Sequence, residues 1–132
     1  MGYSFSFDVD NRIVYIKRYG TIEVSELFKS VKELLSRDEF KHIDMIMTDM
    51  SEADFSRLSA HDIKRLGEYV KNSVKNKRLH VALIAPSDFV FGLSRMFEMF
   101  TDIDTLMVFR NREEAANWLK NNSCLENNPP LL

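Results

Sequence analysis

The sequence predicts an α/β fold with a single mixed sheet, in the order β-β-α-β-α-β-α-β-α. Residues 3–19 alternate between apolar and polar side chains, which is the pattern of strands with one buried face. Residues 79–119 read as strand, helix, strand and helix with short joints, the repeating unit of a parallel sheet. Together these observations predict an antiparallel hairpin that continues into a parallel βα arrangement.

The N-terminal hairpin is predicted from two alternating segments, residues 3–9 and residues 12–19. Asp10 and Asn11 lie between them, and both residue types tolerate positive φ, so we expect a two-residue turn. Gly20 follows the second segment and ends it. The hairpin supplies the antiparallel part of the sheet.

A first helix is predicted for residues 23–37. Its apolar residues recur on one stripe, which consists of Leu27, Phe28, Val31, Leu34 and Leu35. Glu23 and Glu26 lie in the first turn, where the helix dipole favours negative charge. A short third strand follows at residues 43–48, and we expect residues 50–58 to form a loop.

The second helix is predicted to begin with a capping box at Ser59, in which Asp62 takes the place usually held by glutamate. Its core face is formed by four aliphatic residues, Ile63, Leu66, Val70 and Val74. The basic run at residues 71–78 is interpreted as a solvated helix end that complements the helix dipole.

The last βαβα unit begins with the apolar segment at residues 79–85, which is typical of a strand buried on both faces. Pro86 stops this strand, and Ser87 is placed to cap the third helix. The fifth strand is predicted at residues 106–109. A second capping box at residues 111–114 opens the last helix, whose anchors are Ala115, Trp118 and Leu119.

We expect one domain, residues 1–122, because a chain of 132 residues is long enough to bury its own core. Residues 123–132 carry no periodicity and include the run Asn-Asn-Pro-Pro, so we expect a mobile C-terminal tail. Successive right-handed crossovers that advance in one direction place every helix on one face of the sheet. The expected architecture is therefore a βα superhelix with helices mainly on one face and an opposite face that is only partly covered.

Composition excludes several classes of function. The net charge of -2 provides no basic face for nucleic acid. No apolar run approaches the roughly 20 residues that span a bilayer, so we expect no transmembrane segment. The single cysteine, Cys124, can form neither an internal disulfide nor a zinc cluster. Together with the absence of a secretory signal pattern, this favours a cytoplasmic location.

No catalytic or cofactor pattern stands out, so we expect no enzyme, no cofactor and no metal. The three histidines lie on different predicted elements, and no pair has metal-ligand spacing. Asp49, Glu52 and Asp54 share the predicted loop, but they lack the spacing and the glycine of a calcium loop. They are interpreted as a solvated acidic loop. The four glycines cannot assemble a phosphate-binding loop.

The third helix is the strongest functional signal, because it is apolar on more than one side. One stripe, expected to face the sheet, consists of Phe89, Leu93, Met96 and Phe100. Phe91 and Met99 lie on a second stripe with Arg95 between them, which is typical of a contact surface. The alternative is that both tuck against the neighbouring helix. The predicted partner or ligand surface consists of Phe89, Phe91, Arg95, Met96 and Met99.

The element order and two passages resemble the STAS domain, the fold of the bacterial anti-sigma-factor antagonists. Residues 92–100 followed by residues 108–116 resemble the end of that family, where a basic-apolar-Phe helix precedes a strand and a Glu-Glu-Ala helix. Residues 46–51 resemble its third strand and the following loop. The opening residues 3–7, the joint at 20–22 and the run at 85–96 are closer to a divergent STAS-like branch, which shares its superhelix with CRAL-TRIO lipid-transfer domains. The resemblance covers residues 3–120.

The resemblance directs attention to Ser59. Antagonists of the sporulation type carry their phosphoacceptor in Asp-Ser-Ser-Gly at the start of the helix after the third strand. This chain reads Arg57-Leu58-Ser59-Ala60 there, without the aspartate and the glycine. Ser59 is a candidate phosphoacceptor, since a phosphate is stabilised at a helix N-terminus. The alternative is an ordinary N-cap.

The resemblance implies a non-catalytic interaction or regulatory module that docks a protein partner or self-associates as a homodimer. The alternative is a carrier of a small molecule or lipid, associated with a membrane, that uses an apolar pocket under the third helix. An enzyme ranks third, because no nucleophile-base pair or carboxylate dyad has supporting sequence.

Overall fold

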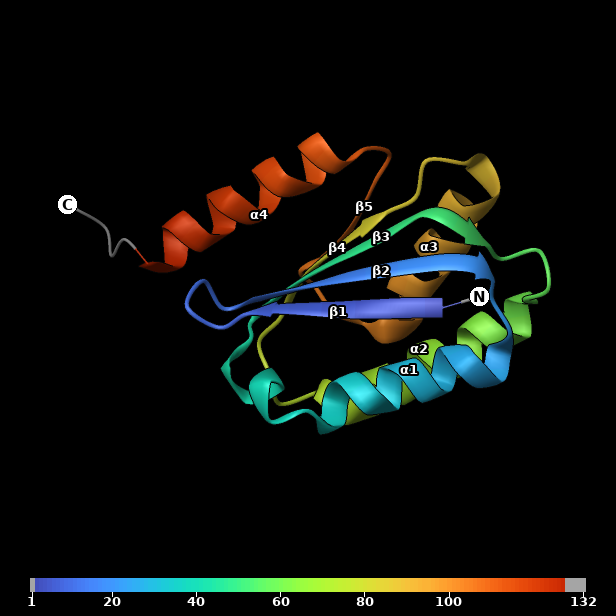
Figure 1. Cartoon of the computed structure of the whole chain (residues 1–132), viewed down its shortest axis with the longest axis horizontal. Helices are drawn as coiled ribbons and strands as arrows, with labels where there is room; N and C mark the ends of the chain where they lie inside the picture. The colour runs from blue at the N-terminus through green and yellow to red at the C-terminus, as the bar shows by residue number, and fades with distance from the viewer. Residues whose placement is uncertain (1, 128–132) are drawn as a thin grey trace.

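The structure is a computed structural model that describes the backbone of residues 2–127 and the side chains of residues 2–122. Five strands form one mixed sheet in the spatial order β1-β2-β3-β4-β5 (Figure 1). Their bounds are β1 Gly2–Asp8, β2 Ile13–Thr21, β3 Met45–Asp54, β4 His80–Ile84 and β5 Leu106–Phe109. The first pair is antiparallel and the other pairs are parallel, which confirms the predicted hairpin and the predicted α/β class.

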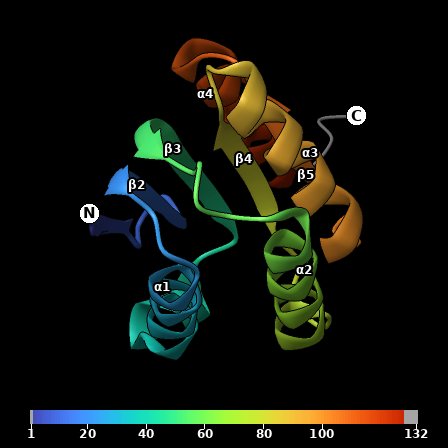
Figure 2. The same cartoon turned by 90° about the vertical axis from the view of Figure 1, so that its right-hand side faces the viewer.

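Four α-helices and one short 3-10 helix connect and follow these strands. Their bounds are α1 Val24–Ser36, η1 Asp38–His42, α2 Ala60–Val74, α3 Asp88–Thr101 and α4 Arg112–Asn127. The three helices that connect parallel strands contribute to one large core on a single face of the sheet. Figure 2 shows α1 and α2 side by side below the sheet, with α3 beside α2. The helices therefore lie mainly on one face, as predicted.

The last helix, α4, lies on the opposite face of the sheet (Figure 1). Its buried residues Ala115 and Leu119 pack in a second core with Met47, Ala82 and Ile84. The expectation that every helix shares one face is therefore wrong for α4. The handedness rule applies only to a helix that connects two parallel strands, and α4 is the last element of the described residues and follows the last strand.

The second face of the sheet is covered only in part, as expected. The second core lies over β3, β4 and β5 and includes only the first residue of β2, Ile13, from the hairpin. On β2, Tyr15 and Tyr19 remain 37% and 43% exposed. The alternation of the hairpin thus separates a buried face from a solvated one.

The hairpin turn is longer than predicted. β1 ends at Asp8 and β2 begins at Ile13, and these two residues are register partners, so the turn contains residues 9–12. Arg12 has a φ of 60°, and its backbone N–H donates to the carbonyl of Val9 at 3.1 Å. The Asn11 amide donates to the Asp8 carboxylate at 2.8 Å. These hydrogen bonds stabilise a four-residue turn in place of the predicted two-residue turn.

Two further boundaries differ from the sequence prediction. β3 continues to Asp54, so residues 50–54 of the predicted loop are strand, because the end of β2 pairs with them after a register shift. α4 continues to Asn127, so residues 123–127 of the predicted tail are helical. The remaining residues of that predicted tail, 128–132, lie outside the described residues.

Candidate functional site

The ends of α3 are defined by local hydrogen bonds and by backbone conformation. Ser87 caps the helix, as predicted, and its hydroxyl accepts from the Val90 backbone N–H at 3.2 Å. Asp102 ends the helix with a left-handed φ of 55°. Between these ends α3 packs beside α2, where Gly67 lies against Phe100. The helix is thus held against α2 along one side.

The predicted sheet-facing stripe of α3 is right for Leu93 and Met96, which pack against the large core, and wrong for Phe89. The fully buried residues of this helix are Val90, Ser94 and Thr101, whereas Phe89 is 54% exposed. Two of these buried residues carry small hydroxyl side chains, and the Thr101 hydroxyl is satisfied by donating to the Glu98 carbonyl at 3.0 Å. The sequence pattern emphasised large apolar residues, but two of the three buried positions carry small hydroxyl side chains.

Four of the five residues predicted as a contact surface lie on one side of α3. Phe89, Met96 and Met99 are spaced at i, i+7 and i+10 around Gly92, and Arg95 lies at the edge. Met99 is 67% exposed, and a shallow hollow is lined by Arg95, Met96, Glu98 and Met99. We call Phe89, Gly92, Arg95, Met96 and Met99 the α3 surface. It combines an apolar centre with a charged edge, since Arg95 pairs with Glu98 at 3.1 Å.

The fifth predicted residue, Phe91, lies on another side of the helix. It is half-buried and packs against the large core. The guanidinium of Arg110 lies 4.1 Å from its ring centroid and also pairs with Asp88 at 2.7 Å. Phe91 therefore packs at the junction of α3 and β5, which separates it from Met99.

Ser59 forms the capping box that the sequence predicts for α2. Its hydroxyl accepts from the Asp62 backbone N–H at 3.2 Å, and the Asp62 carboxylate accepts from the Ser59 N–H at 3.0 Å. This backbone hydrogen bond is the main reason that the pKa of Asp62 lies below its ordinary value. The side chain of Ser59 is exposed, so its role as a phosphoacceptor stays a prediction.

Replacing Ser59 with alanine is expected to cost about 1 kcal/mol of stability, because one N-terminal N–H loses its acceptor. Ser59→Asp should retain the wild-type stability, since aspartate also caps well. Because the pKa of Asp62 is lowered, the carboxylate half of the box is present at neutral pH and is lost as the pH falls through its folded pKa. Urea denaturation of both variants at neutral and acidic pH checks this. A kinase-dependent mass shift at Ser59, with loss of partner binding in Ser59→Asp, would contradict a purely structural role.

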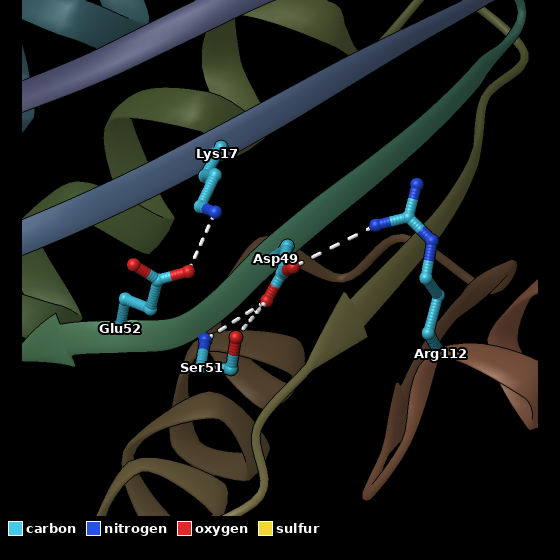
Figure 3. Close-up of polar contacts among 5 residues, drawn as sticks. All are labelled: Lys17, Asp49, Ser51, Glu52 and Arg112. Carbon is cyan, nitrogen blue, oxygen red and sulfur yellow. Dashed lines mark hydrogen bonds and ion pairs between the residues drawn. The ribbon is translucent and has the colours of Figure 1, made fainter.

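The acidic residues of the predicted loop lie on β3, where other side chains engage them (Figure 3). Glu52 pairs with Lys17 of β2 at 2.6 Å, and Asp49 pairs with Arg112 of α4 at 3.6 Å. Ser51 donates to Asp49 through its hydroxyl at 2.7 Å and through its backbone N–H at 2.9 Å. Burial alone would raise the pKa of Asp49, but these hydrogen bonds and positive charges outweigh burial and lower it.

None of the described residues forms a group of three histidine, cysteine or acidic side chains that could hold a metal ion. His42 ends η1, His61 lies in the first turn of α2, and His80 is buried on β4 with its ring 5.9 Å from that of Trp118. Cys124 belongs to the helical backbone of α4, and its side chain lies outside the described part. Within the described part of the chain, no helix is long and apolar enough to cross a membrane.

A cavity of about 130 Å³ lies in the large core, between the sheet and the helices α1, α2 and α3. We call it the core cavity. Its walls are aliphatic and aromatic, and among the described lining residues only Arg18 is charged. Two hydroxyl residues, Thr48 of β3 and Ser94 of α3, also line it. The predicted pocket under the third helix is therefore a space that all three helices share.

Arg18 is a buried residue that sequence reasoning did not single out. It is 7% exposed and lies on β2 on the same face as Val14 and Ile16. Its Nη1 donates to the hydroxyl of Ser30 on α1 at 2.8 Å. Burial lowers the pKa of Arg18 to about 10, so the guanidinium is still charged at neutral pH. The sequence did contain an indication of this, because Arg18 occupies a position of the alternating second strand that otherwise carries inward-facing apolar residues.

Comparison with known proteins identifies a fold. No protein-family model matches the chain, and no curated protein matches it. Among solved structures, the chain is similar to the anti-sigma factor antagonist SpoIIAA in its unphosphorylated form. The TM-score is 0.54 at 16% sequence identity, and the match covers 91% of this chain and 97% of SpoIIAA. The fold is therefore STAS-like, which confirms the resemblance drawn from the sequence.

Proposed function

We propose that this protein is a non-catalytic regulatory module that docks a protein partner through the α3 surface. The single observation that carries the proposal is the exposure of Phe89 and Met99 beside Gly92 on one side of a regular helix. An apolar centre with a charged edge is the usual anatomy of a protein interface. The STAS-like fold supports the proposal, because SpoIIAA is named as an antagonist of an anti-sigma factor.

Gly92 adds a second argument for a partner at the α3 surface. Glycine inside a helix costs about 0.5–1 kcal/mol relative to alanine. A Cβ atom at Gly92 would meet nothing within 4 Å, so packing within the described structure does not require glycine there. A missing side chain at the centre of an exposed surface lets another backbone or ring approach the helix closely. We infer that a partner side chain contacts the helix backbone at this point.

The double variant Phe89→Gln, Met99→Gln is expected to leave the free energy of unfolding within about 0.5 kcal/mol of wild type, as is usual for exposed positions. It should abolish partner capture, because central apolar anchors carry most of the energy of an interface. Urea denaturation and sedimentation velocity on the same samples measure the two effects. A strongly destabilised double variant would show instead that these side chains belong to the core.

The partner itself can be sought with a photo-crosslinking residue at Met99 in the full chain, expressed in its native cells. The matched control carries the same residue at the exposed position Asn72 of α2. We expect one crosslinked protein from Met99, none from Asn72, and loss of the product when Phe89→Gln is added. A product with twice the mass of this chain would assign the surface to a homodimer. No product from either position would contradict the proposal.

A second candidate function is supported by the core cavity. Protein interiors contain few voids larger than a water molecule, so an apolar space of about 130 Å³ is uncommon. A dry cavity of similar size accepts a benzene-sized molecule. The second proposal is that the protein binds a small apolar ligand between the sheet and the helices. The two functions are compatible, because the residues of α3 that line the cavity differ from the exposed ones.

A further inference from the structure

The guanidinium of Arg18 lacks a counter-ion within the described structure. Its one hydrogen bond goes to the Ser30 hydroxyl, which in turn donates to the Leu27 carbonyl at 2.8 Å. None of the described carboxylates forms an ion pair with it. Glu33, one turn further along α1, accepts instead from the Tyr3 hydroxyl at 2.7 Å. A guanidinium has five N–H donors, so most of the hydrogen-bonding capacity of Arg18 is not used by this single bond.

Arg18 also belongs to the wall of the core cavity. Burying a charge without a partner is costly, because the group loses its hydration and gains little in return. Folding has already removed Arg18 from water, since the residue is only 7% exposed. An anion that enters the cavity therefore meets a donor that has already lost most of its hydration. Most of the remaining desolvation cost falls on the anion.

We propose that the core cavity binds a small monocarboxylate, whose carboxylate pairs with Arg18 and whose apolar body fills the space between the sheet and the helices. This inference rests on the second candidate function and does not depend on the α3 surface. The planar fork of a guanidinium matches the two oxygens of a carboxylate. A comparable cavity holds one benzene, so the apolar body has about six carbon atoms, aliphatic or aromatic.

The residues around the cavity explain why the ligand should combine one negative charge with an apolar body. Arg18 and Ser30 place their polar groups between β2 and α1. Aliphatic residues from the opposite side, such as Leu66 of α2 and Leu83 of β4, supply an apolar wall. A dianion would leave a second charge unpaired among such residues. The geometry thus favours a monoanion over a phosphate ester or a dicarboxylate.

The test compares two six-carbon probes, hexanoate and 1-hexanol, in titrations of the full chain at pH 7 followed by calorimetry. Hexanoate is expected to bind wild type at least about tenfold more tightly than 1-hexanol, because hydrogen bonds to charged groups are the stronger ones. Arg18→Met should remove that advantage and leave 1-hexanol binding unchanged. Arg78→Met deletes the same charge from an exposed position and should change neither affinity.

The location is checked by methyl NMR during the same titrations. The methyl signals of Leu66 and Leu83 should shift on binding, whereas those of Leu119 in the second core should not. Equal affinities for the two probes in wild type would overturn the role of Arg18 and leave the apolar ligand site standing. Binding of neither probe would overturn the ligand site as well, without bearing on the α3 surface. Shifts confined to other residues would also contradict the proposal.

Discussion

Replacing Arg18 with methionine is expected to raise the free energy of unfolding by about 1–4 kcal/mol, because an apolar side chain replaces a buried charge that has no ionic partner among the described residues. Methionine is long and unbranched, so it can occupy the space along β2 without a large change in shape. The Ser30 hydroxyl keeps its own bond to the Leu27 carbonyl. Urea denaturation of the ligand-free protein measures the difference.

The pH dependence of this gain has a defined sign. The pKa of Arg18 is lowered to about 10 in the folded state by burial, so the charged form is the destabilised one. The penalty is complete below about pH 10 and is relieved only as the pH rises above that value toward the ordinary pKa of a guanidinium. The stability difference between wild type and Arg18→Met should therefore be constant from pH 6 to about 9. Destabilisation by the variant would show that the bond to Ser30 outweighs the desolvation of the charge.

The second large effect is expected at the contact of α2 and α3. A Cβ atom at Gly67 would lie 2.6 Å from the Cβ atom of Phe100 and 3.3 Å from its backbone carbon. Gly67→Ala therefore forces the helices apart, and overpacking of this kind costs about 1–3 kcal/mol. Helix propensity offsets about 1 kcal/mol of that cost, so we expect a net loss of up to about 2 kcal/mol. Thermal and urea unfolding measure it.

Gly92→Ala is the matched control for Gly67→Ala, because both glycines lie inside helices. At Gly92 the added Cβ meets open space, so only the gain in helix propensity remains, about 0.5–1 kcal/mol. The two variants should therefore change stability in opposite directions. Similar destabilisation in both would mean that the α3 surface is packed against something in the folded chain. Under the proposed function, Gly92→Ala should also weaken partner capture.

Most of the fold could be predicted from the sequence, because secondary structure follows from local patterns. The apolar segment before Pro86 is a central strand with every residue buried, and the fifth strand has the predicted bounds. The caps at Ser59 and Ser87 form as expected, since the side chain and the N–H it caps are three residues apart. The errors occur at the hairpin turn, at the end of β3 and at the end of α4. In the first two, pairing between β1, β2 and β3 decided the boundary.

The candidate site could be predicted only in part. Phe89, Arg95, Met96 and Met99 do share one side of α3, but Phe91 packs beside Arg110 and Phe89 does not face the sheet. α3 is apolar on several sides. Several rotations of the helix about its axis would therefore place an apolar stripe against the core. The packing of α3 in the folded chain selected the rotation that buries Ser94 and Thr101. No local pattern distinguishes that rotation from the others.

The sequence by itself determined the order of strands and helices, their polarity patterns and the STAS-like topology, because residues near each other in the chain encode these features. Only the tertiary structure decided that α4 covers the second face, that Gly67 lies against Phe100 and that Arg18 is enclosed beside a cavity. Burial is a property of neighbours that are distant in the chain. Arg18 became a buried charge only because α1 packs over β2 in the folded chain.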